Sequence, residues 1–250
     1  YVARAYSVAM SGRPGPVVIA LPEDMLIEVA EAVDRPRVDR PAQAPDTGAM
    51  ETFASLISSA QSPVAIVGGA GWNDDAARDF AEFAAAHGIP VAAGFRRQDA
   101  IANDCPVWAG NLGYGPNPKL TDRIKSADLI LAVGARLGEA TTDSYTLVTP
   151  DHPGKTLIHV HPDPNELGHV YRADLAICAG MPEFARAAAA MPKPQEPKPA
   201  GSEAHAEWKA WNTAAPFDTR VDLGMCVAAM REALPADTII YAGLYGTMTL

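Results

Sequence analysis

Short apolar runs that alternate with amphipathic helical patterns are the feature that most constrains the fold of this chain. Five such runs, rich in β-branched residues and alanine, lie at 63–67, 89–93, 127–133, 156–160 and 174–178. Runs of this length and composition are typical of strands buried on both faces of a parallel sheet. Strands that alternate with helices fold with helices on both sheet faces. We therefore predict an α/β fold with a doubly wound, Rossmann-like parallel sheet.

The segments that flank this pattern differ from it. The N-terminal flank combines a helical pattern with the apolar run Pro16–Leu21, and the C-terminal flank combines a helix capped by Asp222 with the run Thr238–Tyr241. Proline-rich stretches separate both flanks from the central pattern and are predicted to be linkers. The predicted segments are 1–22, 23–47 (linker), 48–191 (central domain), 192–221 (linker) and 222–250. Because neither flank has a core of its own, we expect a piece of a longer polypeptide.

Composition and charge exclude several classes of protein. The chain has 20 Lys+Arg against 30 Asp+Glu, a formal net charge of −10, and no basic cluster. Such a chain is a poor partner for nucleic acid or an anionic membrane. No apolar run reaches the ~18 residues of a membrane span, no signal peptide pattern occurs, and the three cysteines form no CxxC motif. We expect a cytoplasmic protein with a small-molecule ligand.

Glycines follow three of the predicted strands, where ligands of doubly wound sheets bind. Gly68 and Gly69 follow the first strand, Gly94 the second and Gly134 the third. Glycines at such positions let backbone N–H groups approach a diphosphate at a helix N-terminus. The spacing is not GxGxxG, so a tight strand-to-helix turn remains an equally open interpretation.

Arginines accompany these glycines. Arg96 and Arg97 follow the second strand, and Arg136 follows the third. Guanidinium groups bind phosphate in a bidentate manner. The alternative for the adjacent pair is a surface ion pair with Asp99 or Asp104.

Polar residues mark the end of the fourth strand. His159 and His161 alternate along it and therefore point to one face, with Asp163 close behind. Two histidines without further ligands are a weak metal motif, so we interpret these residues as strand-end polar groups rather than metal ligands. No nucleophile elbow, HExxH motif or P-loop occurs, so no catalytic residue is predicted.

The order of the motifs resembles thiamine-diphosphate enzymes of the acetolactate synthase type over nearly the whole chain. Ser11–Asp24 (SGRPGPVVIALPED) resembles the end of their pyrimidine-binding domain, and Leu223–Tyr241 resembles the start of their diphosphate-binding domain. The segments that resemble their central domain are Pro63–Gly71, Ala127–Arg136 and Ile158–Gly168 (IHVHPDPNELG).

This resemblance implies a homodimer or homotetramer with thiamine diphosphate and Mg²⁺ bound between domains of two subunits. It implies that a 2-oxo acid loses CO₂ and that the resulting enamine is protonated or transferred to an acceptor, with the cofactor as electron sink. The family's activating glutamate would precede Tyr1, and its GDG…N motif would follow Leu250. Catalytic residues and metal ligands are therefore expected outside this chain.

The resemblance also implies that the central domain binds FAD, ADP or no nucleotide. The candidate nucleotide contacts are Gly68, Gly69, Gly94, Arg96, Gly134, Arg136 and Asp163. Three departures from the synthases argue against FAD. His161 replaces an acidic residue, Leu137–Ala140 lacks a second arginine, and Ala179–Gly180 replaces Gly-Asp. An acidic side chain at such a strand end usually binds a ribose hydroxyl.

Three other interpretations stay open. The central segment alone also fits a nucleotide- or flavin-binding module without thiamine chemistry, such as an electron-transfer-flavoprotein-like domain. An NAD-dependent deacylase or deoxyhypusine-synthase type is a further α/β alternative, although three scattered cysteines exclude the four-cysteine zinc site of a deacylase. A purely structural scaffold is the third, because a fold does not determine a function.

Overall fold

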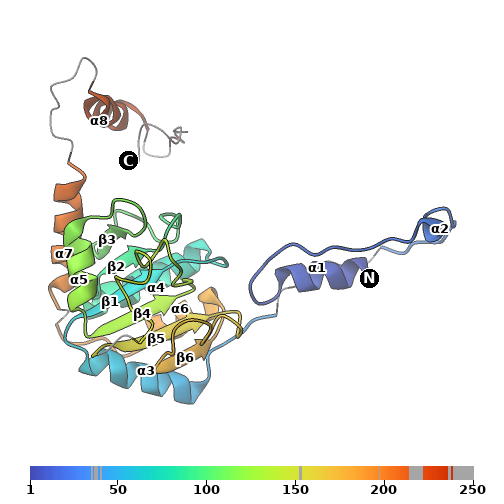
Figure 1. Ribbon diagram of the computed structural model, residues 1–250, viewed down its shortest axis with the longest axis horizontal. Coiled ribbons are helices and arrows are strands. Elements are labelled where there is room, and N and C mark those ends of the chain that lie inside the picture. Colours follow the sequence, from blue (N-terminus) through green and yellow to red (C-terminus); the bar gives the residue numbers. More distant parts are fainter. Residues whose placement is uncertain are drawn as a thin grey trace.

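Six parallel strands form the sheet at the centre of the molecule (Figure 1). The computed structural model describes residues 1–34, 36, 39, 41–151, 154–196, 198–213, 222–235 and 238. The strands are β1 (Pro63–Val67), β2 (Val91–Ala93), β3 (Trp108–Asn111), β4 (Leu129–Val133), β5 (Thr156–His161) and β6 (Leu175–Cys178). Their order is β3-β2-β1-β4-β5-β6, and neighbouring strands are parallel. The predicted doubly wound sheet is thereby confirmed, and the chain direction across it reverses between β1 and β4.

β3 is not among the five strands that the sequence predicts. The strand is short, contains Gly110 and lacks β-branched residues, so its sequence signal is weak. Its pairing with β2 is irregular, with a register shift between Val91 and Ala92. Burial of Trp108 and Ala109 places it in the sheet, which therefore has six strands rather than five.

The apolar run Pro16–Leu21 is also not a strand. Its backbone has no strand partner within the described residues, and Val18 is 92% exposed. A strand needs a neighbouring edge, and this segment extends away from the sheet (Figure 1). The other predicted flanking strand, Thr238–Tyr241, lies outside the described residues except for Thr238.

Capping side chains begin four of the described helices, at Asp46, Asn73, Asn117 and Asp222. Asp46 accepts a hydrogen bond from Ala49 N and thereby caps α3. Asn73 caps α4, which ends at Gly88 in the left-handed conformation. The helices are α1 (Val2–Met10), α2 (Glu23–Leu26), α3 (Thr47–Ser59), α4 (Asp74–His87), α5 (Pro118–Ser126), α6 (Met181–Ala189), α7 (Ala200–Trp211) and α8 (Leu223–Ala233).

Two hydrophobic layers enclose the sheet. α3, α4 and α6 cover one face, where four buried phenylalanines pack with ring centroids 5.3–5.8 Å apart. These residues are Phe53, Phe80, Phe83 and Phe184. α5, α7 and the loop after β4 cover the other face. Alternate strand residues enter opposite layers, which is the pattern of a sheet buried on both sides.

α7 lies in the segment predicted to be a linker, yet it packs against the β3 edge of the sheet. His205 Nδ1 lies 3.0 Å from the carbonyl oxygen of Trp108, and the rings of Trp108 and Trp208 meet edge to face. Lys198 donates to the carbonyl oxygen of Ala60 at the end of α3. The described part of this segment is therefore held on the central domain.

Candidate ligand site at the strand ends

The carboxyl ends of the parallel strands bring most of the predicted site residues to one edge. Gly68 and Gly69 follow β1, and Gly134 and Arg136 follow the adjacent β4. These turns lie where the strand order reverses, which is the usual ligand crevice of such sheets. Asp163 follows β5 on one side, and Gly94 and Arg96 follow β2 on the other.

The glycine turns after β1 and β4 touch each other through their backbones. Gly69 and Gly134 both have positive φ, at 69° and 67°. A Cβ on Gly69 would lie 2.0 Å from the carbonyl oxygen of Gly134, and a Cβ on Gly134 would lie 2.6 Å from that of Gly68. Close backbone packing therefore explains these glycines without a ligand.

Three of the glycine amides are engaged in the sheet. The N–H groups of Gly68, Gly94 and Gly134 donate to Val133, Val67 and Val160 at 3.0, 2.8 and 2.8 Å. They extend the sheet's hydrogen bonding and are not available to a diphosphate. The next amides of the β1 turn, those of Gly69, Ala70 and Gly71, make no hydrogen bond within the described part of the chain. A phosphate at this edge would use these amides.

The three arginines differ in how freely they reach a ligand. Arg97 donates to the carbonyl oxygen of Gly69 and pairs with Asp99 at 3.0 Å, so the ion-pair alternative holds for this residue. The guanidinium of Arg96 lies 5.0 Å from the centre of the Phe95 ring. Arg136 has a 58% exposed side chain and makes a 3.8 Å contact with Glu166. Arg136 is the cation best placed to meet an anion at the crevice.

The histidines of β5 are buried and hydrogen-bonded to the backbone. His159 Nε2 lies 3.0 Å from the carbonyl oxygen of Ala135, which assigns the proton to Nε2. The Nδ1 atom of His159 is buried and has no partner within the described residues. His161 Nδ1 accepts from the N–H of Asp163 at 3.1 Å. Burial lowers the pKa of both histidines, so both rings are neutral near pH 7.

The Asp163 side chain stabilises the turn in which it lies. Its Oδ1 accepts from the backbone and side-chain nitrogens of Asn165, both at 3.0 Å. The backbone hydrogen bond lowers the pKa of the Asp163 carboxyl. Among the described residues no group of three or more His, Cys, Asp or Glu side chains is placed to hold a metal ion. We derive no catalytic step from these residues.

Sequence reasoning missed two polar residues at this edge. Glu166, with an 11% exposed side chain, lies between Arg13 and Arg136. Thr141 is buried in the loop after β4, and its hydroxyl accepts from Phe95 N at 3.2 Å. Glu166 belongs to the quoted DPNELG turn and was detectable there as an acidic side chain. The sequence offers the Thr141 hydroxyl but does not indicate its partner, which lies 46 residues away.

A cavity of about 770 Å³ lies beside this edge, between the outer face of α4 and residues 98–106. Its wall combines alanines of α4, such as Ala77 and Ala81, with charged side chains such as Arg78. None of the strand-end glycines contributes to the lining. It is therefore a separate feature from the strand-end crevice.

The strand order and the alternation of strands with helices define an α/β domain with a doubly wound parallel sheet. The family model described as "Thiamine pyrophosphate enzyme, central domain" matches residues 50–188. The chain therefore belongs to the thiamine pyrophosphate enzyme family, whose central domain it contains. Acetolactate synthase large subunit of Corynebacterium glutamicum is 28% identical over 180 residues, which are 70% of this chain and 28% of that protein. Sulfoacetaldehyde acetyltransferase of Rhodobacter capsulatus is 30% identical over 68% of this chain and 29% of its own length.

A solved structure agrees with this assignment. Benzoylformate decarboxylase from Polynucleobacter necessarius superimposes with a TM-score of 0.62 at 27% identity, over 80% of this chain and 37% of that one. The chain spans less than a third of the length of the two curated relatives. No helix within the described residues combines the length and apolarity needed to cross a membrane.

Proposed function

We propose that this chain is the central part of a thiamine-diphosphate-dependent enzyme that decarboxylates a 2-oxo acid and transfers the remaining fragment to an acceptor, as acetolactate synthase does. The observation that carries the proposal is the central-domain match over residues 50–188, in a sheet of order β3-β2-β1-β4-β5-β6. The relatives support it, because they include an acetolactate synthase, a sulfoacetaldehyde acetyltransferase and a benzoylformate decarboxylase.

The proposal includes the domain boundaries and the assembly. Residues 1–22 are the end of a pyrimidine-binding domain and residues 222–250 the start of a diphosphate-binding domain, joined by 23–47 and 192–221 to the central domain 48–191. Thiamine diphosphate and Mg²⁺ bind outside the described residues, between the outer domains of a cytoplasmic homodimer or homotetramer. The central domain holds these outer domains in place.

The strand-end crevice is proposed to take the diphosphate of a nucleotide such as ADP, since the three departures described above argue against FAD. The amides of Gly69, Ala70 and Gly71 and the exposed guanidinium of Arg136 support this role. A scaffold without a ligand is the second candidate. It is favoured by the backbone contact between Gly69 and Gly134, which accounts for both glycines.

The experiment that tests the catalytic proposal begins with the gene on both sides of this segment. We expect an activating glutamate upstream and a GDG…N motif downstream. The complete protein is then supplied with thiamine diphosphate, Mg²⁺ and either pyruvate or benzoylformate, both of which are 2-oxo acids. Release of CO₂ is expected with one of them, and the remaining fragment is then released as the aldehyde after protonation or joined to a second 2-oxo acid molecule. A complete protein that lacks both motifs and does not bind thiamine diphosphate would refute the proposal and favour the module or scaffold.

A further inference from the structure

One largely buried carboxylate is shared by two arginines from different parts of the chain. Glu166 Oε2 lies 3.7 Å from Arg13 Nη1, and Glu166 Oε1 lies 3.8 Å from Arg136 Nε. The Glu166 side chain is 11% exposed, whereas those of Arg13 and Arg136 are 52% and 58% exposed. The acid is therefore fixed in the structure, and both cations retain freedom to reorient.

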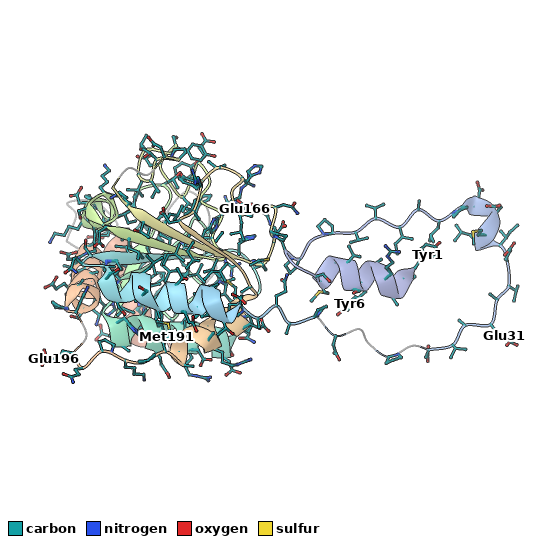
Figure 2. The ribbon with its side chains drawn as sticks, turned by 90° about the horizontal axis from the view of Figure 1, so that it is seen from below. Tyr1, Tyr6, Glu31, Glu166, Met191 and Glu196 are labelled. Carbon is teal, nitrogen blue, oxygen red and sulfur yellow. The ribbon has the colours of Figure 1, made fainter. Side chains whose placement is uncertain are left out.

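The two arginines belong to different structural units. Arg136 lies at the end of β4, in the proposed ligand crevice. Arg13 follows α1, in a turn where Gly12 has a φ of 55° and a Cβ would lie 3.6 Å from the carbonyl oxygen of Pro162. None of the described residues of α1 is buried. Figure 2 shows Glu166 on the side of the domain from which this N-terminal segment extends, with Tyr6 and Tyr1 farther out.

A phosphate in the crevice would compete for one of these cations. Both contacts are longer than a hydrogen bond, whereas a phosphate offers Arg136 two short charge-assisted hydrogen bonds. When Arg136 turns to the phosphate, it leaves Glu166. Of the two guanidinium groups, only that of Arg13 then remains beside Glu166. The attraction between Glu166 and Arg13 then increases, because no second guanidinium neutralises the carboxylate.

We propose that Glu166 couples a phosphate-bearing ligand at the strand-end crevice to the N-terminal segment Tyr1–Leu21, so that ligand binding fastens this segment to the central domain. The coupling rests on the ligand role proposed for the crevice. It is reciprocal, since each site must change the affinity of the other by the same factor. Arg13→Gln is therefore expected to weaken ligand binding, because Glu166 then holds Arg136 more strongly.

The test uses the complete protein that contains this chain, with ADP as probe. Calorimetry measures ADP affinity, and hydrogen exchange measures protection of the N-terminal segment. ADP is expected to slow exchange in Tyr1–Leu21 about fivefold, the lower end of common coupling strengths. Glu166→Gln is expected to bind ADP at least as tightly, yet to lose this protection. The matched control is Glu139→Gln, because Glu139 is exposed and makes no ion pair within the described residues.

Three results would overturn the coupling. The first is ADP binding without protection of the segment, and the second is equal protection in Glu166→Gln. The third is no ADP binding by the unaltered chain, which refutes the coupling and the nucleotide role of the crevice together. That third result leaves the thiamine proposal standing, because CO₂ release by the complete protein tests it separately.

Discussion

The backbones of Gly69 and Gly134 are in contact and leave no room for a side chain at either position. The two glycines lie in the turns that follow the neighbouring strands β1 and β4. A Cβ on Gly69 would lie 2.0 Å from the carbonyl oxygen of Gly134. The contact joins the ends of β1 and β4, the two strands at which the sheet order reverses. A side chain at either position would therefore force these two turns apart.

Gly69→Ala is expected to lower the free energy of unfolding by more than the cost of placing an alanine in the left-handed backbone conformation. Gly115 is the matched control, because it has the same φ of 69° and a methyl group there would meet no atom within 4 Å. Gly115→Ala adds only the left-handed conformational penalty of ~1–2 kcal/mol. Gly69→Ala adds a backbone collision, so we expect a loss of ~3 kcal/mol or more in urea unfolding. Equal losses would show that the turns separate without cost.

Asp128 is expected to hold the turn between α3 and β1. Its carboxylate accepts from Gln61 N at 2.6 Å and Ser62 N at 2.9 Å. Burial opposes ionisation, but these backbone hydrogen bonds prevail and lower the pKa of Asp128. Asp128→Asn should lose ~1–2 kcal/mol of unfolding free energy at pH 7, because the charge-assisted acceptor is removed.

The Asp128 contribution has a defined pH dependence. A carboxyl whose pKa is lowered by folding stabilises the native state above its ordinary pKa of about 3.9, and the contribution is lost as the pH falls below that value. Urea unfolding at pH 7 and pH 3 should therefore show a smaller difference between Asp128→Asn and the unaltered chain at pH 3. Asp122→Asn, at an exposed position on α5, is the control and should match the unaltered chain at both values.

The buried histidines of β5 predict a loss of stability in mild acid. Burial lowers the pKa of His159 and His161, so the unfolded chain takes up protons first as the pH falls. The neutral, buried histidines therefore contribute fully to the stability of the folded state above the ordinary histidine pKa of about 6.5. This contribution is lost as the pH falls below that value. Other charges facing the pair are Glu166, Arg13 and Asp163.

His159→Gln tests this dependence, because an amide nitrogen can still donate to the carbonyl oxygen of Ala135 but does not titrate. We expect the variant to lose less unfolding free energy than the unaltered chain between pH 7.5 and pH 5.5. His169→Gln, at an exposed histidine, should keep the original pH profile. An unchanged profile in His159→Gln would assign the acid sensitivity to other groups.

The sheet was predictable because its central strands are buried on both faces, so that nearly every residue in them is apolar. The cap at Asn73 and the left-handed end at Gly88 were predictable for a local reason, since both depend on residues within one helical turn. β3 escaped prediction because Trp108–Asn111 owes its extended form to pairing with β2 and to cover from α7. Tertiary contacts of this kind leave little trace in a four-residue segment.

The candidate site was predictable only in part. Topology brings Gly68, Gly134 and Arg136 to one edge, as their positions after strands indicate. What each group does there depends on partners distant in sequence, such as the pairing of Glu166 with Arg13. Likewise, the hydrogen bond from Gly68 N to Val133 O removes an amide that the sequence offered to a phosphate. Spacing along one segment carries no information about such partners.

The two tryptophans of α7 are expected to differ in their contribution to stability, although they lie three residues apart. Trp208 meets Trp108 edge to face with ring centroids 6.4 Å apart and stacks on His205, whereas Trp211 is 51% exposed. Trp208→Ala should lose ~2–3 kcal/mol of unfolding free energy, because it removes an aromatic contact and opens the β3 edge. Trp211→Ala, the matched control, should stay within ~0.5 kcal/mol. Similar small losses in both would show that α7 is a linker helix that adds nothing to the stability of the central domain.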